Sequence, residues 1–234
     1  NLTLDDLGFM PAMRARYEAA IHKPNGIVLV TGPTGSGKSS TLYASLQAIY
    51  SIEKNIVTME DPVEINIDGI TQGQINPRSG FTFADGMRSI LRQDPDVIMI
   101  GEMRDLETCE MAIQAALTGH LVFSSLHTND SPSAFTRLMD MGLQPYLITS
   151  TVIGIMAQRL VRALCQRCKE AYDPEPAMLR DIGLKDGIKL FRAKGCQQCK
   201  GTGYKGRVGL FEWLEPDDMV RSMVMQRATA SDIV

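Results

Sequence analysis

The stretch TGPTGSGKSS, at residues 31–40, constrains this chain more than any other feature of its sequence. It has the full spacing of a P-loop and lies between an apolar run at 26–32 and a helical pattern at 38–50. Glycines let backbone N–H groups point inward around a phosphate, and the start of the following helix adds a favourable dipole. The residues predicted to contact the phosphates are Gly32, Pro33, Thr34, Gly35, Ser36, Gly37, Lys38, Ser39 and Ser40.

Two side chains of this loop have specific expected roles. Lys38 should reach the terminal phosphates, and the Ser39 hydroxyl should bind Mg²⁺. A glycine-rich turn that matches by chance is the alternative interpretation. Because a strand precedes the loop and a helix follows it, we favour nucleotide binding.

Short apolar runs alternate with helical patterns as far as residue 164. Strands are predicted at 26–32, 55–60, 96–101 and 121–126, and helices at 38–50, 82–93, 105–118, 131–141 and 145–163, with Thr82 as an N-cap. Residues 63–75 alternate around Asp68 and Gly69, which predicts a hairpin. Strands that alternate with helices indicate an α/β fold with a mostly parallel sheet, covered on both faces.

The pattern changes after residue 164, where cysteines, glycines and charges become dense. We therefore predict a P-loop core at 1–164, a small metal-binding subdomain at 165–206 and closing elements at 207–234. The chain starts without Met and stops at ATASDIV. We expect a fragment of a longer protein whose final helix is truncated.

Charge and hydropathy narrow the class of protein. The chain has 24 basic and 27 acidic residues and a pI near 5.7, which argues against nucleic-acid binding by broad phosphate neutralisation. No signal peptide is visible, and the longest uncharged stretch, 141–158, is polar and interrupted. We expect a cytoplasmic protein with no nucleic-acid partner.

Carboxylates follow two predicted strands at the end where ligands bind in open α/β sheets. Glu60, Asp61 and Glu64 lie in TMEDPVE, and Glu102 follows the strand DVIMIG. Closely spaced carboxylates repel one another unless a cation or water lies among them. A solvated acidic turn is the alternative at the first position. At the second, Glu102 is the candidate to hold Mg²⁺ through water, whereas Asp96 begins the strand and is predicted to be structural.

The strand at 121–126 has a histidine at each end, His120 and His127. His127 is at the end that faces the expected ligand, beside Thr128 and Asn129. We predict that it senses the terminal phosphate, with a packed core histidine as the alternative.

Two CxxC pairs, Cys165 with Cys168 and Cys196 with Cys199, provide four thiolates. Such a set favours a tetrahedral Zn²⁺ ion. Disulfides and a redox motif are the alternatives, but cytosolic thiols stay reduced and a redox CxxC usually occurs singly. No histidine lies nearby, so we predict structural zinc. Cys109 lies in a helical pattern and should pack as a small side chain.

Four segments, in this order, resemble the ATPases of type II secretion and type IV pilus assembly. They are TGPTGSGKSSTLY, TMEDPVE, LRQDPDVIMIGEMRDLET and TGHLVFSSLHTND, the Walker A, Asp box, Walker B and His box of that family. The resemblance covers essentially the whole chain. It implies a RecA-like fold, Mg-dependent hydrolysis of ATP and a homohexameric ring.

The resemblance also implies residue roles. Glu64 matches the glutamate that polarises the attacking water, Glu102 matches the Walker B glutamate, and His120 and His127 match the His-box histidines. Arginines from neighbouring domains or subunits complete the site in ring motors. The arginines that flank the motifs here are Arg78, Arg88, Arg92 and Arg104.

The four-cysteine module and the segment GYKGRVGLFE at 203–212 are similar to the extension and secretion branch of the family. The segments VEINIDGI and STVIGIMAQRLVRALC favour type II secretion, with type IV pilus extension as the alternative. The implied partners are copies of the chain, an inner-membrane platform protein and the cytoplasmic domain of a membrane assembly protein. Through these partners the protein would associate peripherally with the inner membrane.

Two other classes of function are weighed against this one. A nucleic-acid motor on the same fold is disfavoured by the acidic pI and by the lack of a Lys/Arg-rich run. A zinc-ribbon adaptor that binds nucleotide without hydrolysis is disfavoured because both Glu64 and Glu102 are present.

Overall fold

The computed structural model describes residues 3–185 and 187–233 of the chain. The chain divides into two units, a core unit (Asn1–Arg159 with Gly209–Val234) and a cysteine unit (Leu160–Val208).

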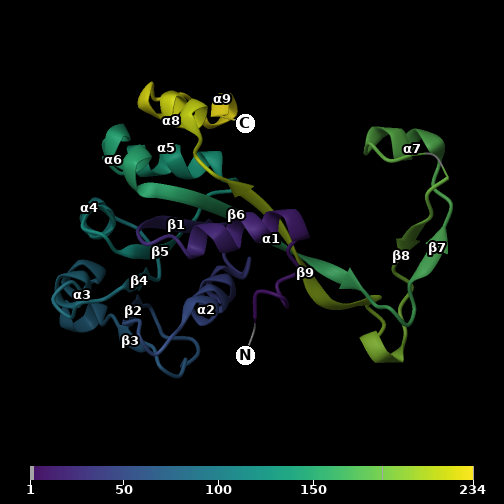
Figure 1. The fold of residues 1–234 in the computed structure, drawn as a ribbon. Helices are drawn as coiled ribbons and strands as arrows, with labels where there is room; N and C mark the ends of the chain where they lie inside the picture. The colour runs from purple at the N-terminus through teal and green to yellow at the C-terminus, as the bar shows by residue number, and fades with distance from the viewer. Residues whose placement is uncertain (1–2, 186, 234) are drawn as a thin grey trace. The chain divides into compact units, whose positions relative to one another are not determined.

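A seven-stranded sheet with the order β3-β2-β4-β5-β1-β6-β9 forms the centre of the core unit (Figure 1). Its strands are β1 (Gly26–Thr31), β2 (Ile56–Glu60), β3 (Thr71–Gln74), β4 (Val97–Ile100), β5 (Leu121–Leu126), β6 (Val152–Leu164) and β9 (Tyr204–Leu214). The pairs from β3 to β6 are parallel. The predicted α/β fold with a mostly parallel sheet is confirmed.

Helices cover both faces of this sheet. The helices are α1 (Pro11–Ile21), α2 (Lys38–Ile49), α3 (Phe83–Ile90), α4 (Leu106–Leu117), α5 (Pro132–Asp140), α6 (Pro145–Thr151), α8 (Asp218–Met225) and α9 (Ala230–Ile233). Alternate residues of β1 enter two separate hydrophobic clusters. Ile27 and Leu29 pack with α3 to α6, α8 and α9, whereas Val28 and Val30 pack with α1 and α2. Strand β1 is therefore buried on both faces, as its apolar sequence predicts.

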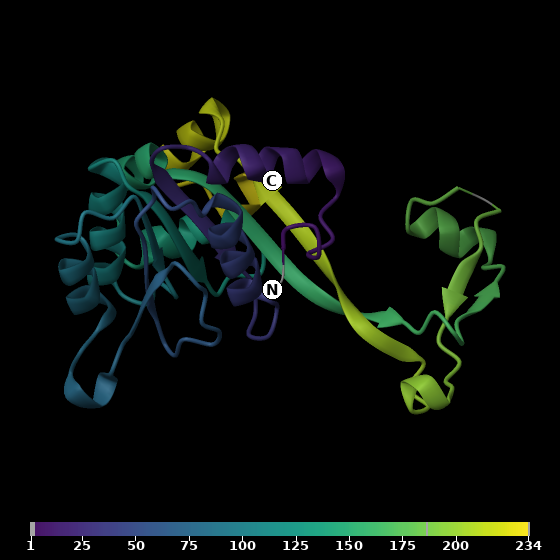
Figure 2. The ribbon, with the colours of Figure 1, turned by 60° about the horizontal axis from the view of Figure 1, so that its bottom comes forward.

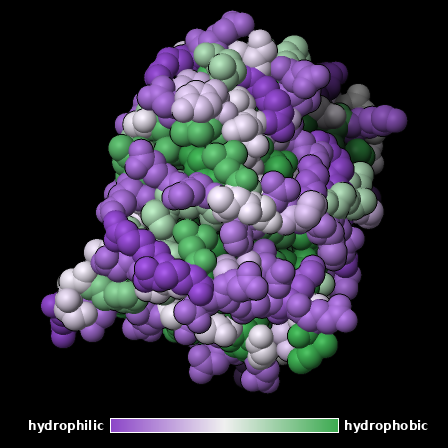
Figure 3. Space-filling model, turned by 60° about the vertical axis from the view of Figure 1, so that its left-hand side comes forward, coloured by the Kyte–Doolittle hydropathy of each residue, from purple (hydrophilic) through white to green (hydrophobic). Residues whose placement is uncertain are grey.

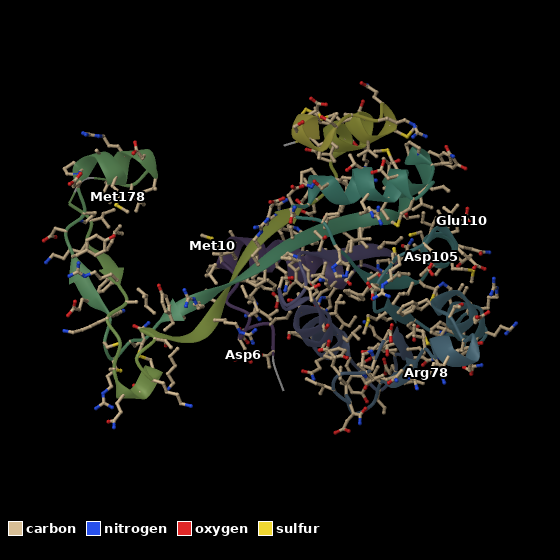
Figure 4. The ribbon with its side chains drawn as sticks, turned by 180° about the vertical axis from the view of Figure 1, so that it is seen from behind. Asp6, Met10, Arg78, Asp105, Glu110 and Met178 are labelled. Carbon is tan, nitrogen blue, oxygen red and sulfur yellow. The ribbon has the colours of Figure 1, made fainter. Side chains whose placement is uncertain are left out.

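Side-chain caps define where two of these helices begin. Thr82 and Asp85 form a capping box at α3, in which the Asp85 amide donates to Thr82 Oγ1 at 3.2 Å. The predicted N-cap at Thr82 is confirmed. Asp105, at the start of α4 (Figure 4), accepts a hydrogen bond from the Thr108 amide at 2.8 Å. These caps satisfy amides that have no partner within the helix.

Aromatic packing joins α1, which we did not predict, and the segment before it to β9, the last strand in the order of the sheet. Figure 2 shows this helix beside the strand. The ring centroids of Tyr17 and Trp213 are 5.2 Å apart, and those of Phe9 and Phe211 are 4.5 Å apart. Such edge-to-face pairs are stabilising beyond their burial.

Two predicted elements are wrong. Residues 63–75 do not form a hairpin, because β3 pairs with β2 in parallel. An alternation of polar and apolar residues indicates a strand but carries no information on its direction. Residues 145–163 are not one helix, because α6 ends at Thr151 and β6 begins at Val152. A short apolar run fits either a buried strand or a buried helix, and pairing with β1 selects the strand.

The cysteine unit is small and has little regular structure. It contains β7 (Glu170–Tyr172) and β8 (Leu190–Arg192), which pair in antiparallel fashion, and the short helix α7 (Pro176–Asp181). The 3₁₀ turn η2 (Gln197–Cys199) carries the last cysteine.

The surface has no single dominant apolar area on the face that Figure 3 displays, where polar side chains surround separate apolar groups. Among the described helices, none combines the length and the apolar character that a membrane crossing needs.

Candidate functional site

The parallel register of the sheet brings the predicted motifs to one edge. Thr31 of β1 pairs with Leu126 of β5, and Ile100 of β4 pairs with Ser124 of β5. Residues that follow these strands therefore emerge side by side, as at the ligand edge of other open α/β sheets. They are the P-loop, the segment that begins at Glu102 and the segment that begins at His127.

The P-loop lies between β1 and α2, and its glycines are required by their surroundings. Gly35 and Gly37 have φ angles of +77° and +89°, which favour glycine. At Gly32, a Cβ atom would lie 2.4 Å from the carbonyl oxygen of Gln158 and 2.6 Å from Ser36 Oγ. The loop is thus packed tightly from behind, and its backbone can adopt the inward-facing shape that binds phosphate.

Polar groups of the loop fit a phosphate ligand. Lys38 Nζ donates to the carbonyl oxygens of Gly32 at 2.9 Å and Pro33 at 3.2 Å, which holds the ammonium group over the loop. Burial lowers the pKa of Lys38, and the Glu102 carboxylate opposes this shift. Ser36 Oγ is buried and has no hydrogen-bond partner within the described part of the chain. Such a hydroxyl is available to a bound anion.

Glu102, Arg104 and His127 form one cluster beside the P-loop. Glu102 is largely buried, forms an ion pair with Arg104 and lies with Oε2 3.2 Å from His127 Nε2. Two hydrogen bonds fix the position of the His127 segment. The Thr128 amide donates to Thr31 Oγ1 at 2.8 Å, and the hydroxyls of Thr31 and Thr128 are also 2.8 Å apart.

The structure separates the carboxylates of the Asp box. Glu64 reaches the P-loop helix, where Ser39 Oγ donates to Glu64 Oε1 at 3.2 Å. Asp61 is exposed. Glu64 is thus the acid of this motif that bonds to Ser39. Asp61 is near Arg104, whose pKa is raised chiefly by Glu102 and also by Asp61. The Ser39 hydroxyl provides an oxygen ligand of the kind that Mg²⁺ prefers.

Glu60 is 4% exposed and turns away from this position. Its carboxylate accepts hydrogen bonds from Thr58 at 2.5 Å, from Gln72 at 3.0 Å and from the Tyr43 hydroxyl. Burial, together with Glu60, raises the pKa of Tyr43 to about 12. Glu60 is therefore a buried core carboxylate whose hydrogen bonds join β2 to α2 and β3.

His120 and Asp96 lie at the opposite edge of the sheet from the P-loop. His120 Nδ1 is 2.9 Å from the Ala115 carbonyl oxygen, at the end of α4. Asp96 Oδ2 accepts a hydrogen bond from the Asn55 amide at 2.7 Å. The structure does not bring either residue to the candidate site.

Sequence reasoning did not identify Gln158, which contacts the P-loop from β6. Its side chain bonds to the Ser36 carbonyl oxygen and to the Thr41 hydroxyl. The signal was a single glutamine that directly follows the apolar run VIGIMA. We had assigned that run to a helix, so the glutamine carried no meaning there.

The four cysteines form a second site, within the cysteine unit. Their sulfur atoms all lie within 4.8 Å of one another, and three of the separations are 3.7, 3.8 and 3.9 Å. A tetrahedral ion with metal–sulfur bonds of about 2.3 Å requires separations of about 3.8 Å. All four are free thiols, so the spacing arises without disulfides.

Backbone amides prepare this cage for charge. The amides of Cys196 and Gly203 donate to Cys199 Sγ at 3.1 and 3.2 Å. Burial disfavours the Cys199 thiolate, but these amides, together with the thiols of Cys196 and Cys168, outweigh it and lower the pKa of Cys199 to about 6. Burial raises the pKa of the neighbouring Cys168 thiol to about 12, so the negative charge is favoured at Cys199. The cage therefore stabilises a thiolate, the form that binds metal.

The parallel sheet, the P-loop after β1 and the acidic groups after β2 and β4 define a P-loop nucleotide-binding protein of the RecA-like class. More narrowly, the chain belongs to the family described as type II/IV secretion system protein, whose model matches residues 1–234. The resemblance to secretion and pilus assembly ATPases is thereby confirmed.

Individual relatives include both type II secretion and type IV pilus assembly ATPases. The chain is 54% identical over 230 residues to type II secretion system ATPase E of Vibrio cholerae. The alignment covers 97% of this chain and 46% of the Vibrio protein. The chain is also 49% identical over 234 residues to type IV pilus assembly ATPase PilB of Thermus thermophilus. That alignment covers 98% of this chain and 26% of PilB. The chain thus spans less than half of the length of each of these relatives.

A solved structure shares the fold. The pilus retraction motor PilT with bound ADP superposes with a TM-score of 0.71 at 30% identity, over 96% of this chain and 56% of PilT.

Proposed function

We propose that this chain is the ATP-hydrolysing motor domain of a hexameric ring that powers type II protein secretion by assembling a pseudopilus. One observation carries the proposal: Glu64 adjoins Ser39, and the cluster of Glu102 and His127 lies beside Lys38, all around one P-loop. Type IV pilus extension is the second candidate, supported by the similarity to PilB over 98% of the chain.

Each residue then has a role at the site. The loop amides and Lys38 bind the phosphates of ATP, and Ser39, with Glu102 through water, would hold Mg²⁺. When bound, Mg²⁺ neutralises charge that develops on the phosphates. Glu64 polarises the attacking water, and His127, held by Glu102, senses the terminal phosphate.

The four-cysteine cage would hold one structural Zn²⁺ ion. The sulfur separations near 3.8 Å and the amide-stabilised thiolate support this assignment. Because four protein ligands fill a tetrahedral ion, the zinc would have no open position for catalysis.

Copies of the chain are the first proposed partners, because a ring lets a neighbour supply arginines to the site. Arg104 is already engaged by Glu102 within its own chain, which leaves that role to other arginines. The further proposed partners are an inner-membrane platform protein and the cytoplasmic domain of a membrane assembly protein. They would hold a cytoplasmic motor at the inner membrane.

Nucleotide binding and turnover by the full-length protein test the site. Lys38→Ala should lose ATP binding, since no neighbouring lysine replaces it in the loop. Glu102→Gln should still bind ATP but hydrolyse it about 10- to 100-fold more slowly, because the loss falls on metal and water organisation. Lys23→Ala, at an exposed lysine outside the loop, is the control. Near-normal turnover by the Lys38 variant would refute the site assignment.

The choice of machine is tested in cells. Deleting the gene should stop extracellular protein secretion and leave surface pili intact. Loss of pili with intact secretion would instead favour pilus extension.

A further inference from the structure

Gln158 of β6 bridges the P-loop and α2 although it is only 3% exposed. Its Nε2 atom donates to the Ser36 carbonyl oxygen at 2.7 Å, and its Oε1 atom accepts from Thr41 Oγ1 at 2.8 Å. The Ser36 carbonyl oxygen can only accept a hydrogen bond, so it must face the Nε2 end of the side chain, and the Thr41 hydroxyl donates to the Oε1 end. These two partners therefore determine the orientation of the amide. Both polar ends of the side chain are satisfied by the loop and by the helix that follows it.

The backbone of the same residue also touches the loop. The Gln158 carbonyl oxygen lies where a Cβ of Gly32 would be, at 2.4 Å from that position. Gln158 therefore supports the loop at both ends, by packing at Gly32 and by a hydrogen bond at Ser36.

Further buried hydrogen bonds surround Thr41, the helix partner of Gln158, without reaching Gln158 itself. Ser45 Oγ donates to the Thr41 carbonyl oxygen at 2.7 Å, and the Tyr17 hydroxyl lies 2.7 Å from Ser45 Oγ. Tyr17, Thr41 and Ser45 are all fully buried. Because these buried groups have no water to bond with, loss of one partner leaves an unpaired polar group.

The geometry of a phosphate loop explains why this contact matters. In a trans peptide unit the N–H and the C=O point in opposite directions, so an amide that points inward at the phosphate leaves the carbonyl of the same unit pointing outward. A buried outward carbonyl needs a donor, and Gln158 provides it for Ser36. We propose that Gln158 is a positioning residue that holds the P-loop in its phosphate-binding shape and thereby increases nucleotide affinity. This inference rests on the nucleotide site proposed above.

The test compares four variants in the full-length protein. Gln158→Met keeps the volume and removes both hydrogen bonds, and Thr41→Val removes only the bond that orients the amide. Ser45→Ala removes the buried hydrogen bond to the Thr41 carbonyl oxygen, a bond that does not touch the loop. Gln114→Met, at an exposed position on α4, is the surface control. For each, the Kd of a fluorescent ATP analogue, KM, kcat and the Tm without nucleotide are measured.

Gln158→Met should raise both Kd and KM about tenfold and change kcat little, because the lost interaction acts equally on bound substrate and transition state. Thr41→Val should raise Kd by about threefold, since the amide stays near its carbonyl partner. Ser45→Ala should lower Tm and leave Kd unchanged. This difference separates positioning of the loop from a general loss of stability.

Three results would overturn the proposal. One is Gln158→Met with wild-type affinity while Lys38→Ala loses binding, which leaves the proposed function intact. Another is an equal loss of affinity in Ser45→Ala, which would reduce the effect to stability. The third is wild-type affinity in Lys38→Ala, which would remove the nucleotide site itself. If Gln158→Met does not fold, unchanged affinity in Thr41→Val also refutes the inference.

Discussion

Glu60 and Glu64 show how two residues of one type, four positions apart, come to differ in role. Glu60 ends β2 inside the core and accepts three hydrogen bonds, from Tyr43, Thr58 and Gln72. Glu64 lies in the following loop, where its carboxylate meets the Ser39 hydroxyl. A carboxylate that positions water must be reached by water, whereas Glu60 is buried and most of its acceptor sites are taken by protein donors.

Substitution of each acid by glutamine should have a different effect. Glu64→Gln should slow ATP hydrolysis about 100-fold or more while nucleotide still binds, because an amide cannot accept a proton from water. Glu60→Gln should lower the free energy of unfolding by about 1–3 kcal/mol, since the new amide group faces donors. Turnover, nucleotide binding and chemical denaturation distinguish the two effects. Full activity in the Glu64 variant and inactivity in a folded Glu60 variant would reverse the assignment.

Strand β6 is the element on which several features of the core depend. It pairs with β1, carries Gln158 to the P-loop and passes beneath the aromatic ring of Trp213 at Gly154. A Cβ atom at Gly154 would lie 2.0 Å from Trp213 Cη2. Glycine at this position therefore allows β9 and its tryptophan to close over the strand.

Gly154→Ala should lower the free energy of unfolding by about 1–3 kcal/mol, through overpacking against the indole ring. Trp213→Phe makes room and gives up no hydrogen bond, because Trp213 Nε1 is buried without a partner in the described chain. The double variant should therefore recover part of the loss, measured by denaturant unfolding in a double-mutant cycle. Strictly additive effects would mean that the two residues do not conflict.

At the scale of the whole molecule, the two units are stabilised by different means. The core unit has two hydrophobic clusters, one on each face of the sheet. In the described part of the cysteine unit, the buried side chains are those of Leu179, Cys165 and Cys199. So small an apolar core cannot offset the entropy of ordering such a segment, which is why small domains of this kind depend on metal.

We expect the metal of the cysteine unit to be zinc. Purified protein should contain about one Zn²⁺ per chain, and Cys196→Ser should release it and increase hydrogen exchange across residues 165–206. Nucleotide affinity should persist, because the core packs independently. Cys109→Ala is the matched control, since this buried thiol lies in the core and should leave zinc content unchanged. A metal-free wild-type protein with disulfides within each CxxC pair under cytosolic redox conditions would contradict the prediction.

The sequence alone determined the features that depend on short spacings. The P-loop, the parallel α/β pattern, the N-cap at Thr82 and the paired cysteines are local arrangements, and their chemistry follows from a few neighbouring residues. The order of four such motifs was enough to indicate the family. Tertiary structure decided the direction of β3, the change from helix to strand at Val152 and the burial of Glu60 away from Ser39.

These decisions share one physical reason. Each depends on partners that are distant in sequence, and a local pattern contains no information on which distant partner a group will meet. Gln158 is the clearest case, because its amide meets a carbonyl group 122 residues away. No sequence motif includes Gln158, and its contact with the P-loop arises entirely from the packing of β6 behind that loop.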